Sequence, residues 1–354
     1  MAIYICSYVV MGIIGVTVPK VITNKKMQRK MFAWFGGILL FFLFALRHPS
    51  MGIDLGYKKN VGYLVSFDRI STFSWKQIWT VKVYYYERGY IIFNKIVSSI
   101  WPNRQFFLAV TAAVSIFPIT LVFYRKAQEP LFSWCIYMGL PALLILFSGL
   151  RQGIAIGWCL FSVLFIQEKK PIKFLITVLL CSNFHSSAIL FLIAYPLYHF
   201  KANKNWYTLG LFVLPIIFIF RYQLFSIFSK LFKEEAIPND TGAMGLMLVF
   251  IVIYIFCFIF DKRGEKSNGL LNLFYIACLC QLFAGIYNTA MRLGYYFTLP
   301  LTLLIPQTVE NMKWNLKEKA LIKLLIVFAF VVFGLNSIYS SSWACAYPYS
   351  FFWQ

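Results

Sequence analysis

The feature that most constrains this chain is a series of apolar segments separated by short turns that carry charge. About 20 consecutive apolar residues form a helix long enough to cross the hydrocarbon core of a bilayer. The chain has 354 residues, of which 60% are hydrophobic and 13% charged, and it is more apolar than a soluble domain needs to fill its core. A membrane barrel would alternate apolar and polar residues instead. The sequence therefore predicts an all-α polytopic membrane protein.

By segment length the sequence predicts about 12 transmembrane helices. The expected spans are residues 2–19, 31–46, 106–123, 131–149, 152–167, 171–184, 187–200, 206–220, 243–260, 270–288, 293–309 and 320–339. A long loop, residues 47–105, follows the second span, and its aromatic stretch Trp75–Trp101 adds a candidate interfacial helix. No internal repeat and no Gly/Ser-rich linker interrupts the chain. We expect a single membrane-embedded domain, residues 1–354, that contains this loop.

The placement of the basic residues predicts the orientation of the spans. The net charge is +21, but most of it lies in short turns, which argues against a nucleic-acid partner. The turns after the first, third, fifth, seventh, ninth and eleventh spans hold more than half of the Lys and Arg residues, so they should face the cytoplasm. The first span has no basic residue before it and a basic cluster after it, the reverse of a signal peptide. Both termini and the loop 47–105 are therefore expected to be extracytoplasmic.

Four arginines stand directly at expected outer ends of spans, where the orientation rule does not favour positive charge. They are Arg47, Arg151, Arg221 and Arg292. A guanidinium group binds phosphate oxygens two at a time and stays charged in any setting. We therefore expect these arginines to converge on an outward-facing cavity that binds a phosphorylated lipid. The alternative is that each one extends to lipid headgroups or pairs with a carboxylate.

His185 is predicted at the same membrane rim as Arg151, because the chain leaves that rim once and returns once between them. A histidine, with an unperturbed pKa of about 6.5, acts as a base or donates to a phosphate or a sugar hydroxyl. The alternative is a histidine that hydrogen-bonds to Asn183, Ser186 or Ser187 and closes a tight turn.

The carboxylates of the outer loop are Asp54, Asp68 and Glu87, in a setting rich in Tyr and Trp. Aromatic faces stack on sugar rings and carboxylates bind hydroxyl groups, so the loop is suited to hold a glycan. The same aromatic residues also suit a belt at the level of the lipid headgroups. Glu87 precedes Arg88, so a local ion pair is an alternative to a role in substrate binding.

Missing motifs exclude several classes of enzyme. The sequence has no DxD or ExD pair for a metal–nucleotide sugar, no Walker loop, and no HExxH or GxSxG motif. Seven of the eight cysteines lie in apolar spans, where a free thiol behaves as a small hydrophobe, so neither a disulfide framework nor a CxxC metal site is expected. No expected span carries Asp or Glu near its centre, which disfavours a proton-coupled transporter.

Short motifs occur in order from the first outer arginine to the last. They are Arg47 with Gly52-Ile53-Asp54, Glu87–Tyr90 with Asn94–Ile96, Leu150–Ala155, Asn183–Ala188, and Asn288 with Arg292 and Tyr296. Together they resemble those of the EpsG-type, Wzy-like polysaccharide polymerases. The Arg-Gln-Gly-Ile-Ala and Phe-His-Ser-Ser motifs are the most specific part of the resemblance.

The resemblance implies a polymerase of surface polysaccharide (exopolysaccharide, capsule or O-antigen) in a bacterial inner or plasma membrane. Its donor would be a growing undecaprenyl-pyrophosphate-linked glycan, and its acceptor the hydroxyl of a lipid-linked repeat. The implied fold is a glycosyltransferase-C-like multi-span bundle, and the chemistry is expected to need no metal or other cofactor. A chain-length regulator and a flippase would be further partners, beside the lipid-linked oligosaccharide and the bilayer.

The resemblance also implies roles for individual residues. The leaving pyrophosphate would be held by Arg151 and Arg292, with Arg47 and Arg221 in support. The acceptor proton would pass to His185 first, or else to one of Asp54, Asp68 and Glu87. Further substrate contacts are expected from residues inside the matching motifs, namely Gln152, Tyr90 and Tyr296.

Two other functions fit the same residues. A different glycosyltransferase or a glycan ligase that uses lipid-linked donors would share the arginine chemistry but would not make a polymer. An exporter of glycan or lipid belongs to another class, and it would need a polar path through the bilayer centre.

Overall fold

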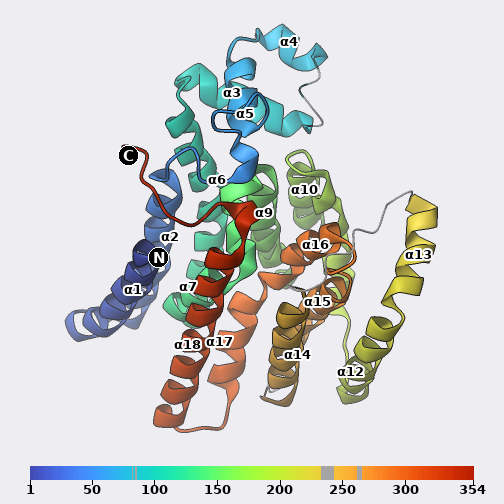
Figure 1. The fold of residues 1–354 in the computed structure, drawn as a ribbon. Coiled ribbons are helices and arrows are strands. Elements are labelled where there is room, and N and C mark those ends of the chain that lie inside the picture. The colour runs from blue at the N-terminus through green and yellow to red at the C-terminus, as the bar shows by residue number, and fades with distance from the viewer. Residues whose placement is uncertain (82, 84–85, 233–242, 261–264) are drawn as a thin grey trace. The chain divides into compact units, whose positions relative to one another are not determined.

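The computed structural model of the chain consists of helices and loops without a β-strand in the residues it describes, which are 1–81, 83, 86–232, 243–260 and 265–354 (Figure 1). Contacts divide the chain into two compact units. The first contains Met1–Leu190 and Ala320–Gln354, and the second contains Phe191–Lys319. The expectation of one membrane-embedded domain over the whole chain stays a prediction.

The first unit contains two long N-terminal helices, a group of helices from the outer loop, and the helices that carry Arg151 and His185. Its helices are α1 (Ala2–Val21), α2 (Lys25–Ala45), α3 (Tyr63–Ser71), α4 (Trp75–Thr80), α5 (Arg88–Ile100), α6 (Arg104–Lys126), α7 (Pro130–Gly139), α8 (Ile145–Ser148), α9 (Leu150–Gln167), α10 (Pro171–Ser182) and most of α18 (Leu316–Ser340). Short 3₁₀ helices are η1 (Ile53–Leu55), η2 (Pro141–Leu144) and η4 (Ser342–Ala344).

The second unit begins inside the 3₁₀ helix η3 (Ser186–Ile193) and is helical throughout its described part. Its helices are α11 (Ala194–His199), α12 (Lys204–Ile219), α13 (Arg221–Phe232), α14 (Ala243–Phe260), α15 (Glu265–Leu282), α16 (Asn288–Thr298) and α17 (Leu301–Asn311). Residues 261–264, part of one predicted cytoplasmic turn, lie outside the described residues.

The candidate membrane spans confirm a multi-span helical protein but not the expected number of spans. In the described residues five helices are long and apolar enough to cross a bilayer: Ala2–Val21, Lys25–Ala45, Arg104–Lys126, Leu150–Gln167 and Leu316–Ser340. Two bent helix pairs raise the number to seven. Four of the other expected spans correspond to shorter apolar helices, Pro171–Ser182, Ser186–His199, Met244–Phe260 and Gly269–Leu282. Hydropathy alone did not show where these segments stop being α-helical.

The first bent pair breaks inside the expected span 131–149, whereas the second breaks where the expected span 206–220 ends. The segments Pro130–Gly139 and Pro141–Ser148 meet at 72°, because Pro141 has no N–H to continue the helix and its ring clashes with the preceding turn. The segments Lys204–Ile219 and Arg221–Ile227 meet at 75°. The first bend directs the chain into the short helix α8 and then, through Gly149, into α9, which begins next to Arg151.

Small residues allow the helices of the first unit to pack closely. An ideal Cβ built on Gly37 of α2 would lie 2.2 Å from the Thr120 hydroxyl of α6, and one on Gly157 of α9 would lie 2.4 Å from the Ser115 carbonyl of α6. Helices inside a membrane associate through such close contacts, because lipid supplies no hydrophobic drive between them. Helix α6 thus packs between α2 and α9, the helix that carries Arg151.

We expect Gly157→Ala to destabilise the protein by about 1 to 3 kcal/mol, because the added methyl group overlaps a backbone oxygen that has no rotamer to change. Gly12→Ala is the matched control, since a Cβ on Gly12 meets nothing within 4 Å. Thermal unfolding of the two variants in detergent measures the difference. An unchanged midpoint for Gly157→Ala would contradict the packing of α6 against α9.

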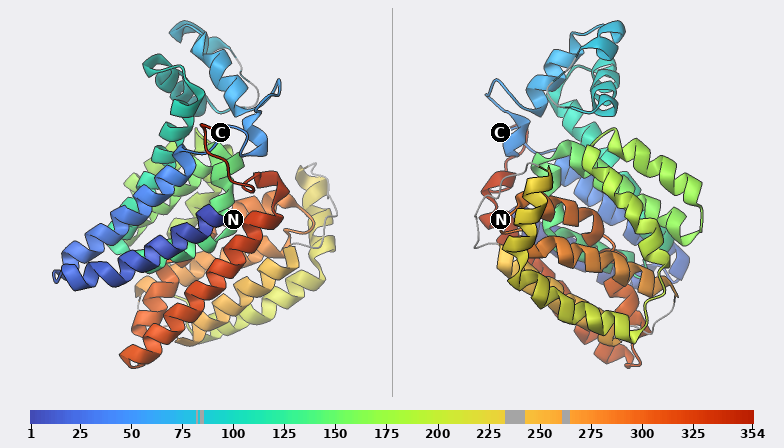
Figure 2. Two further views of the ribbon diagram at one scale, coloured as in Figure 1. Left: turned by 60° about the vertical axis from the view of Figure 1, so that its left-hand side comes forward. Right: turned by 90° about the vertical axis from the view of Figure 1, so that its right-hand side faces the viewer.

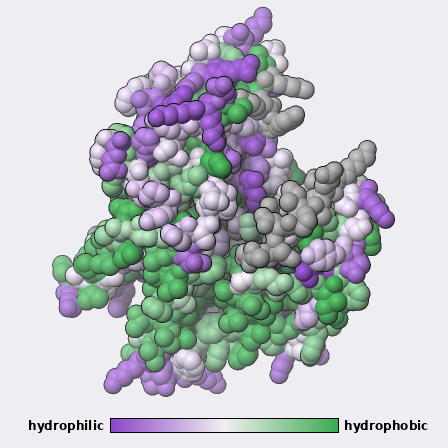
Figure 3. Space-filling model, viewed as in Figure 1, coloured by the Kyte–Doolittle hydropathy of each residue, from purple (hydrophilic) through white to green (hydrophobic). Residues whose placement is uncertain are grey.

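The outer loop is a compact group of helices rather than an irregular segment. Leu64, Phe67 and Tyr90 form a core between α3, α5 and α6, and Ile78 of α4 packs with Ile70 and Ile91 in a second cluster. The surface over α3–α5 is mainly hydrophilic, whereas the surface over α18 is mainly hydrophobic (Figure 3). The interfacial helix expected within Trp75–Trp101 is two helices, α4 and α5.

Both termini lie at the end of the first unit that carries the outer loop. Helices α1 and α2 run side by side in opposite directions, so the start of α1 is close to the end of α2 (Figure 2). The C-terminal segment reaches the same place, where the Phe352 N–H donates to the Leu46 carbonyl at 2.9 Å and the Tyr4 hydroxyl donates to the Ala346 carbonyl at 2.5 Å. The two termini and the loop therefore share one end of the unit, while the side of the membrane that this end faces stays a prediction.

Candidate functional site

Glu87 joins the two residues that the sequence predicts at one rim. One oxygen of its carboxylate, Oε2, forms an ion pair with Nη1 of Arg151. The other oxygen, Oε1, accepts a hydrogen bond of 2.7 Å from the Ser186 N–H and lies 3.7 Å from Nδ1 of His185. A single carboxylate thus links the start of α9 to the turn between α10 and η3.

The local fold explains why Glu87 points at this turn. Glu87 is the N-cap residue of α5, but its side chain does not cap that helix and is directed to the neighbouring segment instead. The Tyr90 N–H donates to the Asn183 carbonyl at 3.1 Å. Gly89 permits this approach, because a Cβ at Gly89 would lie 2.8 Å from both the Cβ and the carbonyl oxygen of Asn183. The first turn of α5 is therefore fixed against the turn that carries His185.

Aromatic rings surround the guanidinium group of Arg151. Its Cζ lies 4.5 Å from the ring centroid of Tyr86 and 6.0 Å from that of Tyr63, and its Nε donates to the Tyr63 hydroxyl at 3.4 Å. The two tyrosine rings stack at 5.6 Å. The side chain of Arg151 is 17% exposed, so these contacts fix its position while one edge remains open.

His185 occupies the tight turn that ends α10. Its N–H donates to the Cys181 carbonyl at 3.0 Å, and its carbonyl accepts from the Ala188 N–H at 2.9 Å. The backbone of His185 thus closes the turn, and the imidazole is left to face Glu87. Its side chain is 18% exposed.

Glu87 is ionised in this setting. Burial raises the pKa of its carboxyl group, but the Ser186 N–H, its own backbone N–H, the charge of Arg151 and the neighbouring His185 together hold the pKa of Glu87 below its usual value. Both oxygens already have partners and the proton affinity is low. The carboxylate is thus better suited to hold Arg151 and His185 in place than to act as a base.

The other loop acids lie outside this cluster. Asp68 pairs with Arg104, and Nε of Arg104 lies 2.9 Å from Oδ2 of Asp68. Both side chains are more than 40% exposed. Asp54 lies in η1 and is exposed. The alternative of a local Glu87–Arg88 ion pair is wrong, because Arg88 donates to the carbonyls of Ile78 and Val81 while Glu87 pairs with Arg151.

Arg47 is enclosed in the first unit. Its side chain is 2% exposed, its Nη1 donates to the Leu146 carbonyl at 2.7 Å, and its guanidinium group lies over the rings of Phe44 and Phe147 at 5.7 and 5.2 Å. The backbone of Arg47 also forms an isolated antiparallel β-bridge with Phe351 of the C-terminal segment. No contact joins Arg47 to Glu87 or His185 in the described part of the chain.

Two further predicted contacts are buried beside the cluster. Gln152 follows Arg151 in α9 and is 1% exposed. Tyr90 is fully buried, with its ring edge-on to Tyr63 and Tyr86 at 5.7 and 5.4 Å. Tyr90 therefore packs against the two tyrosines of the cluster.

The remaining predicted residues belong to the second unit. Arg221 stands at the break between α12 and α13, where its Nη1 donates to the Phe218 carbonyl at 2.7 Å and its guanidinium group lies 3.9 Å from the Phe218 ring centroid. Arg292 lies in α16 and is partly exposed. Tyr296 is buried one turn later, with its ring 6.4 Å from that of Phe191. The expected meeting of these residues with Arg151 in one pocket stays a prediction.

The sequence reasoning missed Tyr63, Tyr86 and Ser186 as parts of the cluster. The two tyrosines come from the aromatic loop, where no periodicity separates a residue beside the site from one in a headgroup belt. Ser186 contributes only its backbone N–H, which no residue type reveals. A signal was available for Glu87, because it lies inside a matching motif, but Asp54 lies inside one as well.

The cluster has the parts that an acceptor-activating site needs. It holds a guanidinium group for an anionic leaving group and an imidazole beside an oriented carboxylate.

No curated protein and no solved structure matches this chain. The EpsG family matches residues 30–351, a range that includes every residue of the cluster. The chain therefore belongs to the EpsG family, a membership that implies involvement in exopolysaccharide biosynthesis.

Proposed function

We propose that this protein polymerises a surface polysaccharide at the outer face of a bacterial membrane. It transfers a growing undecaprenyl-pyrophosphate-linked glycan onto the hydroxyl of a lipid-linked repeat. The observation that carries the proposal is the cluster of Arg151, Glu87 and His185 in a protein of the EpsG family. The glycosyltransferase-C-like bundle of about 12 spans, with both termini outside, belongs to the same proposal.

Arg151 is proposed to bind the pyrophosphate of the donor. Glu87 occupies Nη1 and Tyr63 contacts Nε, while no hydrogen bond from the described residues occupies Nη2. As the bond between the anomeric carbon and the pyrophosphate oxygen breaks, negative charge grows on that oxygen. A fixed guanidinium group stabilises this charge without having to reorganise.

His185 is proposed to take the acceptor proton. The Glu87 carboxylate lies 3.7 Å from Nδ1, beyond hydrogen-bond distance, and its negative charge is proposed to favour the tautomer with the proton on Nδ1, so that Nε2 acts as the base. The acceptor hydroxyl attacks the anomeric carbon, its proton passes to Nε2, and the bonding electrons leave with the pyrophosphate. Glu87 orients the base and is not itself the base.

The other predicted residues take supporting roles in this proposal. In the second unit, Arg292 and Arg221 provide further contacts for the pyrophosphate, and Tyr296 shapes their surroundings. Asp54 and Asp68, of which Asp68 pairs with Arg104, are proposed to bind hydroxyl groups of the glycan. Because the Arg47 side chain is 2% exposed, we assign it a supporting role rather than a direct contact with the lipid.

Product length tests the proposal. Purified protein in liposomes, supplied with lipid-linked repeats and no other acceptor, is expected to produce a ladder of glycans on the lipid. Empty liposomes are the control. Single repeats left unchanged would favour a ligase that needs another acceptor, and lipid scrambling without new glycosidic bonds would favour an exporter. Either result would contradict the polymerase.

A further inference from the structure

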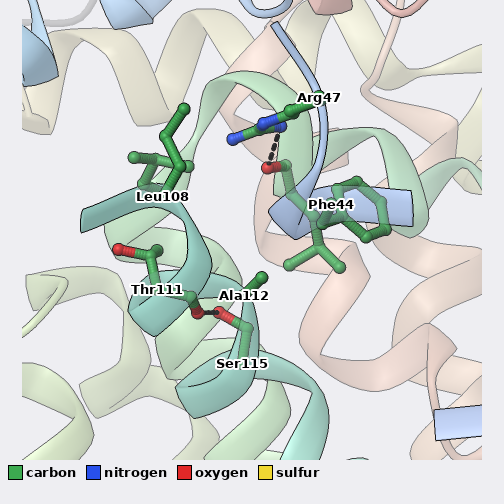
Figure 4. Close-up of a pocket in the computed structure, with 8 residues that line it drawn as sticks. Phe44, Arg47, Leu108, Thr111, Ala112 and Ser115 are labelled. Carbon is green, nitrogen blue, oxygen red and sulfur yellow. Dashed lines mark hydrogen bonds between the residues drawn. The ribbon is translucent and has the colours of Figure 1, made fainter. Parts of the chain in front are cut away.

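A small cavity in the first unit lies against the buried guanidinium group of Arg47. It has a volume of about 10 Å³, room for about one group of the size of a water molecule, and its lining includes Arg47, Leu108, Thr111 and Leu146. Figure 4 shows Arg47 at one side of this space, with its hydrogen bond to Leu146, and Thr111 and Ser115 of α6 below it. The cavity is separate from the cluster around Glu87.

Two buried polar atoms of the lining residues lack hydrogen-bond partners in the described part of the chain. They are Nε of Arg47 and the hydroxyl oxygen of Thr111, whose side chains are both about 2% exposed. The hydroxyl of Ser115, by contrast, donates to the Thr111 carbonyl at 2.8 Å. Native proteins rarely leave buried donors unpaired, so such atoms usually mark the place of a bound water or ion.

The charge of Arg47 decides between a water and an ion. Burial lowers the pKa of Arg47 to about 10, so the guanidinium group keeps its charge at neutral pH. No carboxylate of the described residues forms an ion pair with it, and the side chains that act on its charge are those of Tyr349 and Tyr4. The Leu146 carbonyl and two aromatic rings offset part of the charge. An isolated buried cation is still costly, and a water supplies hydrogen bonds but no opposite charge.

We propose that this cavity binds a monovalent halide ion, chloride in the cell, held by the guanidinium group of Arg47 and the hydroxyl of Thr111. The ion neutralises a cation that would otherwise be unpaired between α2, α6 and the bend before α9. A phosphate or sulfate ion is too large for the space. The proposal does not rest on polymerase activity.

Salt exchange in purified protein tests the halide site. At constant ionic strength, replacing sodium gluconate by sodium chloride or sodium bromide should raise the thermal unfolding midpoint by about 2 to 4 °C, because a ligand that binds only the folded state stabilises it. Crystals grown in bromide should show an anomalous peak beside Arg47. Equal midpoints in all three salts, or no anomalous peak in this cavity, would overturn the proposal and indicate a bound water instead.

Two buried threonines of α6 provide a matched pair of variants. Thr111→Val removes a hydroxyl that lines the cavity, whereas Thr120→Val removes one that already donates to the Ile116 carbonyl at 3.0 Å. We expect the midpoint difference between chloride and gluconate to shrink by at least half in Thr111→Val and to persist in Thr120→Val. An unchanged difference in Thr111→Val, or an equal loss in both variants, would contradict the assigned ligands.

Discussion

Cells in which Arg151 is replaced by alanine should insert the protein but accumulate single-repeat glycans. Removing one preorganised donor for a developing oxyanion typically lowers the rate by about 100-fold or more. The same substitution leaves Glu87 without its ion-pair partner, so a purely structural effect has to be separated from the catalytic one. Glycan length on gels, together with the amount of protein in the membrane, provides the first measurement.

Arg151→Lys separates the two effects. Lysine keeps the positive charge beside Glu87 and should keep the unfolding midpoint close to that of the wild type. It lacks the planar fork that binds two phosphate oxygens, so polymer formation should remain at least about tenfold below normal. Arg29→Ala is the control for a helix-terminal arginine. In the described part of the chain Arg29 donates to the Ala127 carbonyl at 3.0 Å, and its loss should leave glycan length unchanged. Long glycans of normal abundance in Arg151→Ala would end the case for this residue.

Glu87→Ala is expected to lower the free energy of unfolding by about 2 to 4 kcal/mol and also to abolish polymer formation. The variant leaves Arg151 without its counter-charge and the Ser186 N–H without its acceptor, and each loss inside a largely buried cluster is costly. Denaturation in mixed micelles measures the stability, and the liposome assay measures the activity.

Glu129→Ala is the matched control for the loss of a glutamate from an ion pair. Glu129 pairs with Lys323, but its side chain is 37% exposed, so its loss should cost less than about 1 kcal/mol. Glu87→Gln preserves the shape and an acceptor for Ser186 but removes the charge, so it should be more stable than Glu87→Ala and still inactive. Equal stability of Glu87→Ala and the wild type would contradict the role of Glu87 as the link between three segments.

The proximity of Arg151 and His185 could be predicted because it follows from the path of the chain. One helix leaves the rim after Arg151 and the next one returns to it before His185, and the structure brings both side chains to the same carboxylate. The identity of that carboxylate could not be predicted. Glu87 and Arg151 are 64 positions apart, and the loop between α2 and α6 folds by tertiary contacts that have no sequence period.

The number of spans shows a second limit of sequence reasoning. Hydropathy identified the apolar segments, but it did not show that the chain forms a 3₁₀ helix after the helix that ends at Ser182. It also did not show that a sharp bend at Pro141 divides the expected span 131–149 into two helical segments. The proline was visible, and its effect was predictable in principle. The burial of Arg47 was not predictable from the sequence, because it depends on a C-terminal segment that folds back onto the end of α2.

The most direct test of the account is a structure of the protein in a lipid nanodisc with an undecaprenyl-pyrophosphate-linked repeat bound. We predict density for the pyrophosphate within hydrogen-bond distance of the Arg151 guanidinium group, with a sugar hydroxyl of the acceptor facing Nε2 of His185. Pyrophosphate bound elsewhere, with Arg151 still closed by Glu87 and its two tyrosines, would contradict the account.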